Sequence, residues 1–270
     1  MSDPLAVIAR LPGVPEAVEE ARRAVDLLYR HRVLRRASPT VSAESSLRGA
    51  RASAAIEGVD VPLDVLRRDQ AHDPVVQGAL RASAELGRLG PTWRKAPRQV
   101  LARLHTVAAA GLADAAGLGR PRTEAPDSPR TGRAADEPGD PLGLGPAPDA
   151  KDTGARMEGL FELLATPTKA PAIVLAAVVH AELAVLRPFG TADGVVARAA
   201  ERLTLVEYGL DPKSLAAVEV GHLELPYGEG LRAYLTGTSE GVAQWVRQCA
   251  SAVTLGVREA TAICEALQRG

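Results

Sequence analysis

The feature that most constrains this fold is an apolar run, from Pro171 to Leu186, that is hydrophobic on nearly every side. A helix without a polar face has to be enclosed by other elements, so we expect this segment at the centre of a helical bundle. The run is short for a membrane span, and His180 and Glu182 interrupt it. Because no signal peptide opens the chain either, the sequence predicts a soluble protein of the cytoplasm.

The composition also favours an all-α fold. Of the 270 residues, 46% are hydrophobic but only 3% are aromatic, so Ala, Leu and Val have to build the core, which suits close-packed helices. The formal net charge of -1 gives no reason to expect nucleic acid or a membrane as a partner. Nearly all positive charge is Arg, which we attribute to a GC-rich, bacterial genome. Cys249 and Cys264 fall in one expected helix, about 22 Å apart, too far for a disulfide.

The pattern predicts one helical domain with a flexible arm at 1–14, an N-terminal helical region at 15–90 and a C-terminal helix extension at 253–270. The main helical domain covers 97–252, and within it 121–152 carries seven prolines and four glycines. So few apolar residues remain there that we expect a mobile loop. The expected helices span 17–36, 42–57, 62–68, 74–89, 97–111, 153–164, 171–186, 191–208, 227–237 and 239–268.

After the apolar helix, the chain breaks at Pro188, turns through Gly190 and restarts as a helix near Thr191. A helix that begins after a tight turn directs its free N–H groups into the gap, which makes a site for an anion. Gly194 lets a ligand come close to the backbone. The sequence therefore predicts an anion-binding loop here.

Residues 187–198 resemble the signature loop of the Fic (Fido) family, His-Pro-Phe-x-Asp/Glu-Gly-Asn-Gly-Arg-x-x-Arg. Pro188, Phe189, Gly194 and Arg198 match that pattern. The resemblance runs from about residue 42 to residue 252. It implies an all-α Fic-type bundle, with an N-terminal helical region packed on it. In that family the segment corresponding to 121–152 holds a hairpin that aligns a target peptide, but no strand pair can be read here.

Fic enzymes mostly transfer AMP from ATP to a target hydroxyl, and the resemblance assigns a role to each position of the loop. Arg187 replaces the catalytic histidine, and a guanidinium stays protonated, so it cannot act as a base. Thr191 replaces the acidic residue that holds magnesium. Asp193 and Val195 replace an asparagine and an arginine that hold phosphates. His180 lies two helical turns before the loop and is expected to be structural. Together these substitutions imply that adenylyl transfer is lost.

A second motif, Ser53-Ala54-Ala55-Ile56-Glu57-Gly58, resembles the inhibitory motif of the same family, Ser/Thr-x-x-x-Glu-Gly/Asn. In that family the glutamate pairs with the last arginine of the loop and blocks productive ATP binding. The resemblance therefore implies a Glu57–Arg198 pair. Two interpretations stay open, a buried ion pair that joins two helices, which we favour, and a gate on a nucleotide site.

Three functions are compatible with these residues. The first is a degenerate Fic protein that binds a nucleotide or phosphate weakly, through Arg187, Gly194 and Arg198, or binds a protein. The second is a divergent adenylyl- or phosphoryl-transferase that uses Asp193 as base or metal ligand. The third is an interaction protein, monomer or homodimer, whose Ala-rich helices contact an unknown partner.

No cofactor is certain from the sequence. ATP is the candidate nucleotide, and the loss of the acidic position argues against Mg²⁺. We expect no metal site, because no two histidines have ligand spacing and His222 is expected in a loop between helices.

Overall fold

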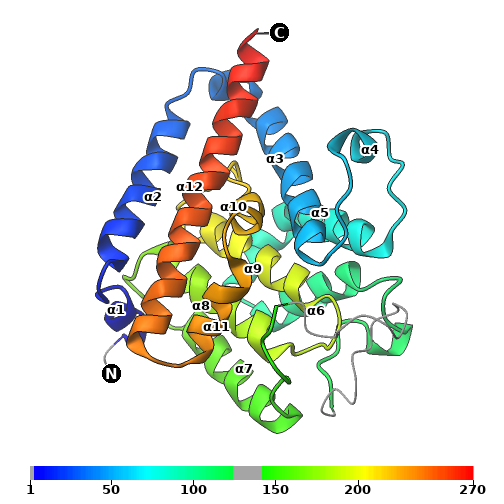
Figure 1. The fold of residues 1–270 in the computed structure, drawn as a ribbon, viewed down its shortest axis with the longest axis vertical. Helices are drawn as coiled ribbons and strands as arrows, with labels where there is room; N and C mark the ends of the chain where they lie inside the picture. The colour runs from blue at the N-terminus through cyan, green and yellow to red at the C-terminus, as the bar shows by residue number, and fades with distance from the viewer. Residues whose placement is uncertain (1–2, 124–141, 270) are drawn as a thin grey trace.

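The computed structural model describes residues 3–123 and 142–269, and in these ranges the chain forms α-helices and one 3₁₀ turn but no β-strand (Figure 1). This confirms the all-α prediction. The elements are α1 (Pro4–Ile8), α2 (Val14–Tyr29), α3 (Leu34–Ile56), α4 (Leu63–Arg67), α5 (Pro74–Trp93), α6 (Pro97–Ala108), η1 (Ala115–Gly117), α7 (Ala150–Ala165), α8 (Ala172–Leu186), α9 (Asp193–Glu207), α10 (Val218–Glu224), α11 (Tyr227–Leu235) and α12 (Ser239–Arg269).

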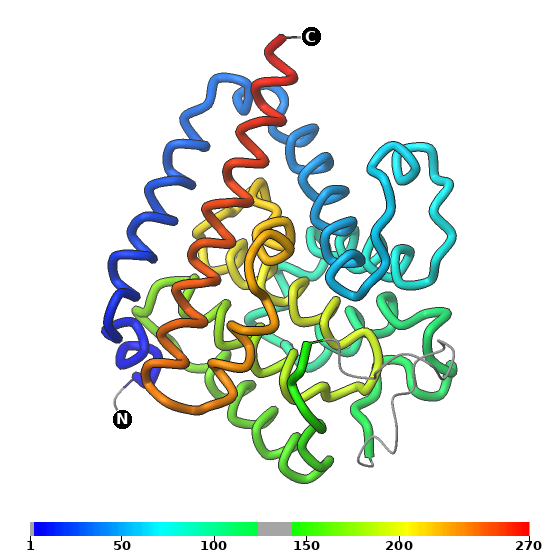
Figure 2. Tube along the Cα trace, viewed as in Figure 1, coloured from blue at the N-terminus to red at the C-terminus, as the bar shows by residue number. Residues whose placement is uncertain are grey.

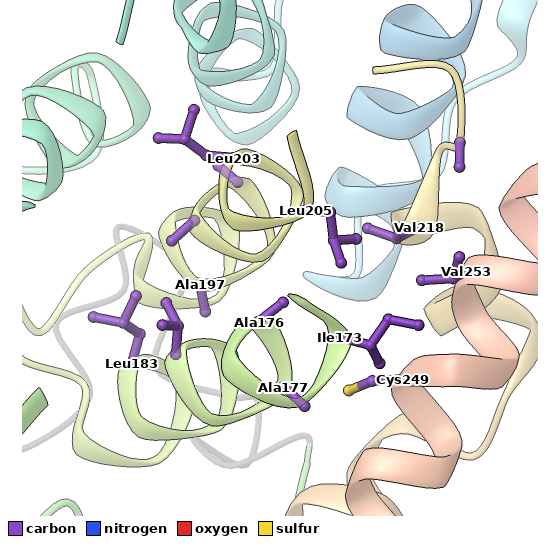
Figure 3. Close-up of a cluster of buried hydrophobic side chains, with 14 of the residues drawn as sticks. Ile173, Ala176, Ala177, Leu183, Ala197, Leu203, Leu205, Val218, Cys249 and Val253 are labelled. Carbon is purple, nitrogen blue, oxygen red and sulfur yellow. The ribbon is translucent and has the colours of Figure 1, made fainter. Parts of the chain in front are cut away.

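The apolar helix α8 lies at the centre, as its sequence predicts. It is buried along almost its whole length and packs on α9 and α12. Figure 3 shows Ala176 and Ala177 of α8 close to Ala197 of α9 and to Cys249 of α12. Small side chains at these contacts let the helix backbones come close together, and the aliphatic residues between them exclude water.

The long helix α12 runs the length of one side of the molecule, beside α2 (Figure 1). Figure 2 shows α1 beside the first turns of α12. Because α12 is one continuous helix, the expected boundary between 252 and 253 falls inside it. In the described part of the chain, no helix is both long enough and apolar enough to cross a membrane.

The N-terminal residues differ from the expected flexible arm. Asp3 caps the short helix α1, and its side chain also accepts a hydrogen bond from the Thr168 hydroxyl at 2.7 Å. Leu5 is only 1% exposed, because α1 packs on α8 and α12. Because Leu5 packs in the core, it holds in place a segment whose composition is typical of a flexible chain end.

The first two long helices also have different limits from those expected. The chain leaves α2 after Tyr29, and α3 already begins at Leu34. Pro39 does not end a helix. It lies just after a kink at Ala37, where the helix effectively restarts. Pro39 therefore stands in a first turn, where a backbone N–H would have no intrahelical partner and its absence costs nothing. Of the expected mobile loop at 121–152, residues 124–141 lie outside the described ranges, and 150–152 form the first turn of α7.

Candidate functional site

The first part of the signature loop, residues 187–192, joins α8 to α9 in a strained conformation. Arg187 and Ala192 have left-handed φ angles of 47° and 53°, and Gly190 has a φ of 80°. Non-glycine residues adopt such angles at a cost of roughly 1–2 kcal/mol each, so the contacts around the loop have to hold it in place.

Asp193 supplies one of these contacts. Its carboxylate Oδ1 accepts a hydrogen bond from the backbone N–H of Phe189 at 2.9 Å. The side chain is only 7% exposed. Burial raises the pKa of Asp193 to about 7, although hydrogen bonds from the amides of Phe189 and Gly190 oppose the rise. The loop amides, which the sequence predicts as a site for an external anion, thus face a carboxylate of the protein itself.

His105 of α6 supports the loop from its other side. Its ring stacks on Phe189, with centroids 4.2 Å apart and planes inclined by 6°. Its Nδ1 accepts the N–H of Gly119 at 2.9 Å, so the ring proton is on Nε2, which donates to Thr191 Oγ1 at 3.2 Å. Burial lowers the pKa of His105 to about 4, and the ring is therefore neutral at pH 7. Thr191, at the family's metal-binding position, is engaged with this ring.

Arg122 fastens the loop to the end of α8. Its guanidinium donates to the carbonyls of Leu186 at 3.1 Å and of Arg187 at 2.9 Å, and its backbone N–H donates to the Pro188 carbonyl at 2.8 Å. It also donates to Thr153 Oγ1 on α7 at 2.8 Å. A cation at the C-terminus of a helix satisfies carbonyls that have no intrahelical partner and interacts favourably with the helix dipole.

Arg187, at the position of the family's catalytic histidine, points across the loop to another segment. Its Nη2 donates to the carbonyl of Gly145 at 2.5 Å. The Arg187 guanidinium is thus directed to the segment around Gly145. A guanidinium in this place can bind an acceptor but cannot take a proton from a hydroxyl.

Arg198 of α9 is fully buried, and it is held by groups of the protein. Its Nη2 lies 2.6 Å from Glu57 Oε1 and also donates to the Ser53 carbonyl at 3.0 Å, while Nε donates to Ser53 Oγ at 2.9 Å. Nη1 donates to the Tyr227 hydroxyl at 3.3 Å. Glu57 is 30% exposed, so this ion pair joins α3 to α9 at the boundary between the core and the solvent.

Gly194 is what allows Glu57 to come so close. A Cβ added at Gly194 would lie 2.2 Å from Glu57 Oε1, closer than real Cβ atoms lie, and 3.2 Å from Arg198 Nη1, a tight contact. Gly194, which the sequence predicts as a point of close approach for a ligand, instead accommodates the carboxylate of Glu57. The structure therefore brings the two motifs together at one point.

Two of the remaining expected residues lie in the core. Val195, at the position of the family's first arginine, is 4% exposed. His180 is completely buried and contacts Glu201 and Tyr227, so it does not reach the loop. A cavity of about 360 Å³ lies between α2 and α12, and its lining contains no residue of the signature loop.

Sequence reasoning missed the role of two residues at this site. Arg122 closes the segment Gly119-Arg120-Pro121-Arg122, and only the fold places its side chain on the end of α8. Tyr227 comes from α11 and has no local signal. Its hydroxyl links Arg198 to His180, at 3.3 and 2.8 Å.

No protein-family model matches the chain, and no curated protein matches it. Several solved structures, in contrast, are similar to this chain. A Fic family protein from Desulfovibrio desulfuricans G20 superposes with a TM-score of 0.69 at 20% identity, over 92% of this chain and 74% of that one. Fic-1 from C. elegans superposes with a TM-score of 0.66 at 15% identity, over 93% and 73%, and a variant of Fic-1 does so at 0.64 and 14%, over 93% and 73%. The chain therefore has the fold of the Fic proteins, as the motifs predicted.

Proposed function

We propose that this chain, which has the fold of the Fic proteins, does not transfer AMP and acts by binding. The observation that carries the proposal is the hydrogen bond from the Phe189 amide to the Asp193 carboxylate, which occupies an amide that would otherwise serve a phosphate. A phosphate at the loop would have to displace this carboxylate. If both stayed, the two negative charges would repel each other.

Each chemical requirement of the family reaction meets an obstacle in this chain. A base has to accept a proton near neutral pH, and Arg187 cannot. Magnesium needs a carboxylate ligand with free lone pairs, whereas Thr191 is hydrogen-bonded to His105 and Asp193 is turned to the loop amides. Arg198, which matches the last arginine of the motif, is enclosed by its contacts with Ser53. Correcting one of these features leaves the others in place.

The experiment is titration calorimetry of the purified protein with ATP, with and without magnesium. We expect no saturable heat for the wild type, and binding that becomes measurable in the double variant Glu57→Gly/Asp193→Ala, which removes both carboxylates from the loop. Asp26→Ala, which removes an exposed carboxylate from α2, is the matched control and should behave as the wild type. Tight, magnesium-dependent ATP binding by the wild type would contradict the closed loop.

The lost activity is tested separately, by incubating the wild type with labelled ATP and cell lysate. We expect no AMP on any protein, and efficient transfer would overturn the proposal. A binding role further predicts that light scattering of the wild type finds a stable dimer or a complex with a partner protein, unaffected by ATP. A monomer indifferent to every protein offered would count against that role.

A second candidate function has one observation in its favour. The pKa of Asp193, raised to about 7 by burial, is close to the value that suits a general base at neutral pH. A divergent transferase that used Asp193 would increase the mass of a target protein in lysate. Asp193→Ala would abolish this increase and Asp26→Ala would not.

A further inference from the structure

Four side chains with metal-binding atoms meet in the core, on the far side of Arg198 and Tyr227 from the signature loop. They are His180 of α8, Glu201 of α9, His222 of α10 and Cys249 of α12. One ligand atom from each lies within 4.8 Å of all the others. His222, expected in a loop, is in a helix and fully buried.

Glu201 is at the centre of this group. Its Oε2 lies 2.6 Å from His180 Nδ1 and 2.7 Å from His222 Nε2. All four residues are at most 1% exposed. Trp245 stacks on the His222 ring, with centroids 5.7 Å apart, so an apolar wall separates the cluster from water. Figure 3 shows the Cys249 side chain pointing from α12 toward α8.

The charge of Glu201 is not balanced by a guanidinium. Its ion-pair partners in the described chain are the two histidines. The buried guanidiniums on the same helix are paired elsewhere, Arg198 with Glu57 and Arg202 with Glu219. A buried carboxylate is costly unless an opposite charge lies against it, and a metal ion in the cluster would supply that charge.

His222 directs its Nε2 at Glu201, 2.7 Å from Oε2, so Nε2 is the atom with which this ring can bind an ion in the cluster. The other ring nitrogen, Nδ1, is buried and has no hydrogen-bond partner within residues 3–123 and 142–269.

We propose that His180, Glu201, His222 and Cys249 bind one structural Zn²⁺ ion. Two imidazoles, a thiolate and a carboxylate form a ligand set that favours zinc over magnesium or calcium. With Cys249 and Glu201 each contributing one negative charge, the site is neutral, and the thiol proton is released to solvent when the ion binds. Four helices supply one ligand each, so the ion joins α8, α9, α10 and α12.

The spacing of the ligand atoms is compatible with this ion after a small adjustment. Zinc–ligand bonds of about 2.0–2.3 Å place the ligand atoms of a tetrahedron about 3.4 Å apart, between the 2.6 Å and 4.8 Å found in the cluster. His180 Nδ1 would bind the ion, and its proton would move to Nε2, which faces the Tyr227 hydroxyl at 2.8 Å. Such a hydrogen bond to the second ring nitrogen is the usual support of a metal-bound histidine.

The test is metal analysis of tag-free, full-length protein produced in zinc-containing medium. We expect one zinc per chain in the wild type, and much less than one in Cys249→Ala and in His222→Ala. Cys264→Ala is the matched control, since Cys264 is a second fully buried cysteine of α12 outside the cluster, and this variant should keep its zinc.

Cobalt replacement gives an independent readout on the wild type alone. Co²⁺ in this site should produce the visible bands of a tetrahedral ion and a thiolate charge-transfer band, and Cys264→Ala should retain both. A folded wild type that contains no metal, and gives no such spectrum with Co²⁺, would overturn the proposal and leave the four side chains as a hydrogen-bonded cluster of the core. This result would leave the proposed loss of AMP transfer untouched, because the two rest on different residues.

Discussion

Replacement of Gly194 by alanine tests whether the contact between the two motifs is what the structure indicates. Gly194 lies in the first turn of α9, where alanine is intrinsically better than glycine by about 0.5–1 kcal/mol. The new Cβ, however, would lie 2.2 Å from Glu57 Oε1. Because that atom is the end of a flexible side chain, we expect Glu57 to turn away and the pair with Arg198 to break.

The expected cost follows from the exposure of the pair. A hydrogen bond to a charged group contributes about 1.5–3 kcal/mol, and the 30% exposure of Glu57 places this one near the lower end. Arg198 stays buried but keeps Ser53 and Tyr227 as partners. After the helical gain is subtracted, Gly194→Ala should destabilise the wild type by about 1 kcal/mol.

In the background Glu57→Ala, the same substitution meets no carboxylate, and the remaining 3.2 Å contact with Arg198 Nη1 is relieved by a small shift of that side chain, so the substitution should stabilise the protein by up to about 0.5–1 kcal/mol. The assay is urea unfolding of the four proteins in this cycle, followed by circular dichroism. A change of sign between the two backgrounds is the expected result. If Gly194→Ala has the same effect in both, the close contact between Glu57 and α9 is not a determinant of stability and our reading of Gly194 is wrong.

Three further predictions concern the loop itself. Because the folded-state pKa of Asp193 is about 7 against an ordinary value of 3.8, the native state holds this proton more tightly, and its contribution to the free energy of unfolding falls as pH rises from about 4 to about 7. Asp193→Asn keeps an acceptor for the Phe189 amide but does not titrate. Urea unfolding at several pH values measures the difference in the free energy of unfolding between wild type and variant. This difference should shift in favour of the variant by up to about 4 kcal/mol across this range. Arg122→Ala should lower the free energy of unfolding by about 2–3 kcal/mol. Arg122→Lys should restore only part of this loss, because lysine lacks the planar guanidinium. Equal stability of the wild type and both variants would contradict the capping role. Arg187→His should not create AMP transfer in a labelled-ATP assay, because the other substitutions of the loop remain.

The sequence predicted much of the arrangement around the loop because the signals were local. An apolar helix without a polar face can only be central, and Pro188 with Gly190 can only interrupt it. The motif at 53–58 and the one at 187–198 led to the Fic fold, which the similar solved structures confirm. The sequence could not predict that Asp193 turns its carboxylate to the amides of its own loop, since a residue in the first turn of a helix can equally face solvent.

The sequence by itself determined the helical class, the central position of α8 and the identity of the substituted loop residues, because periodicity and residue chemistry are local properties. Only the tertiary structure decided which side chains meet. His180, Glu201, His222 and Cys249 are separated by tens of residues along the chain and show no ligand spacing, yet four helices bring them within 4.8 Å of one another. The packing of apolar helix faces sets the positions of α8, α9, α10 and α12. A polar cluster at the centre of the core therefore depends on all four helices at once.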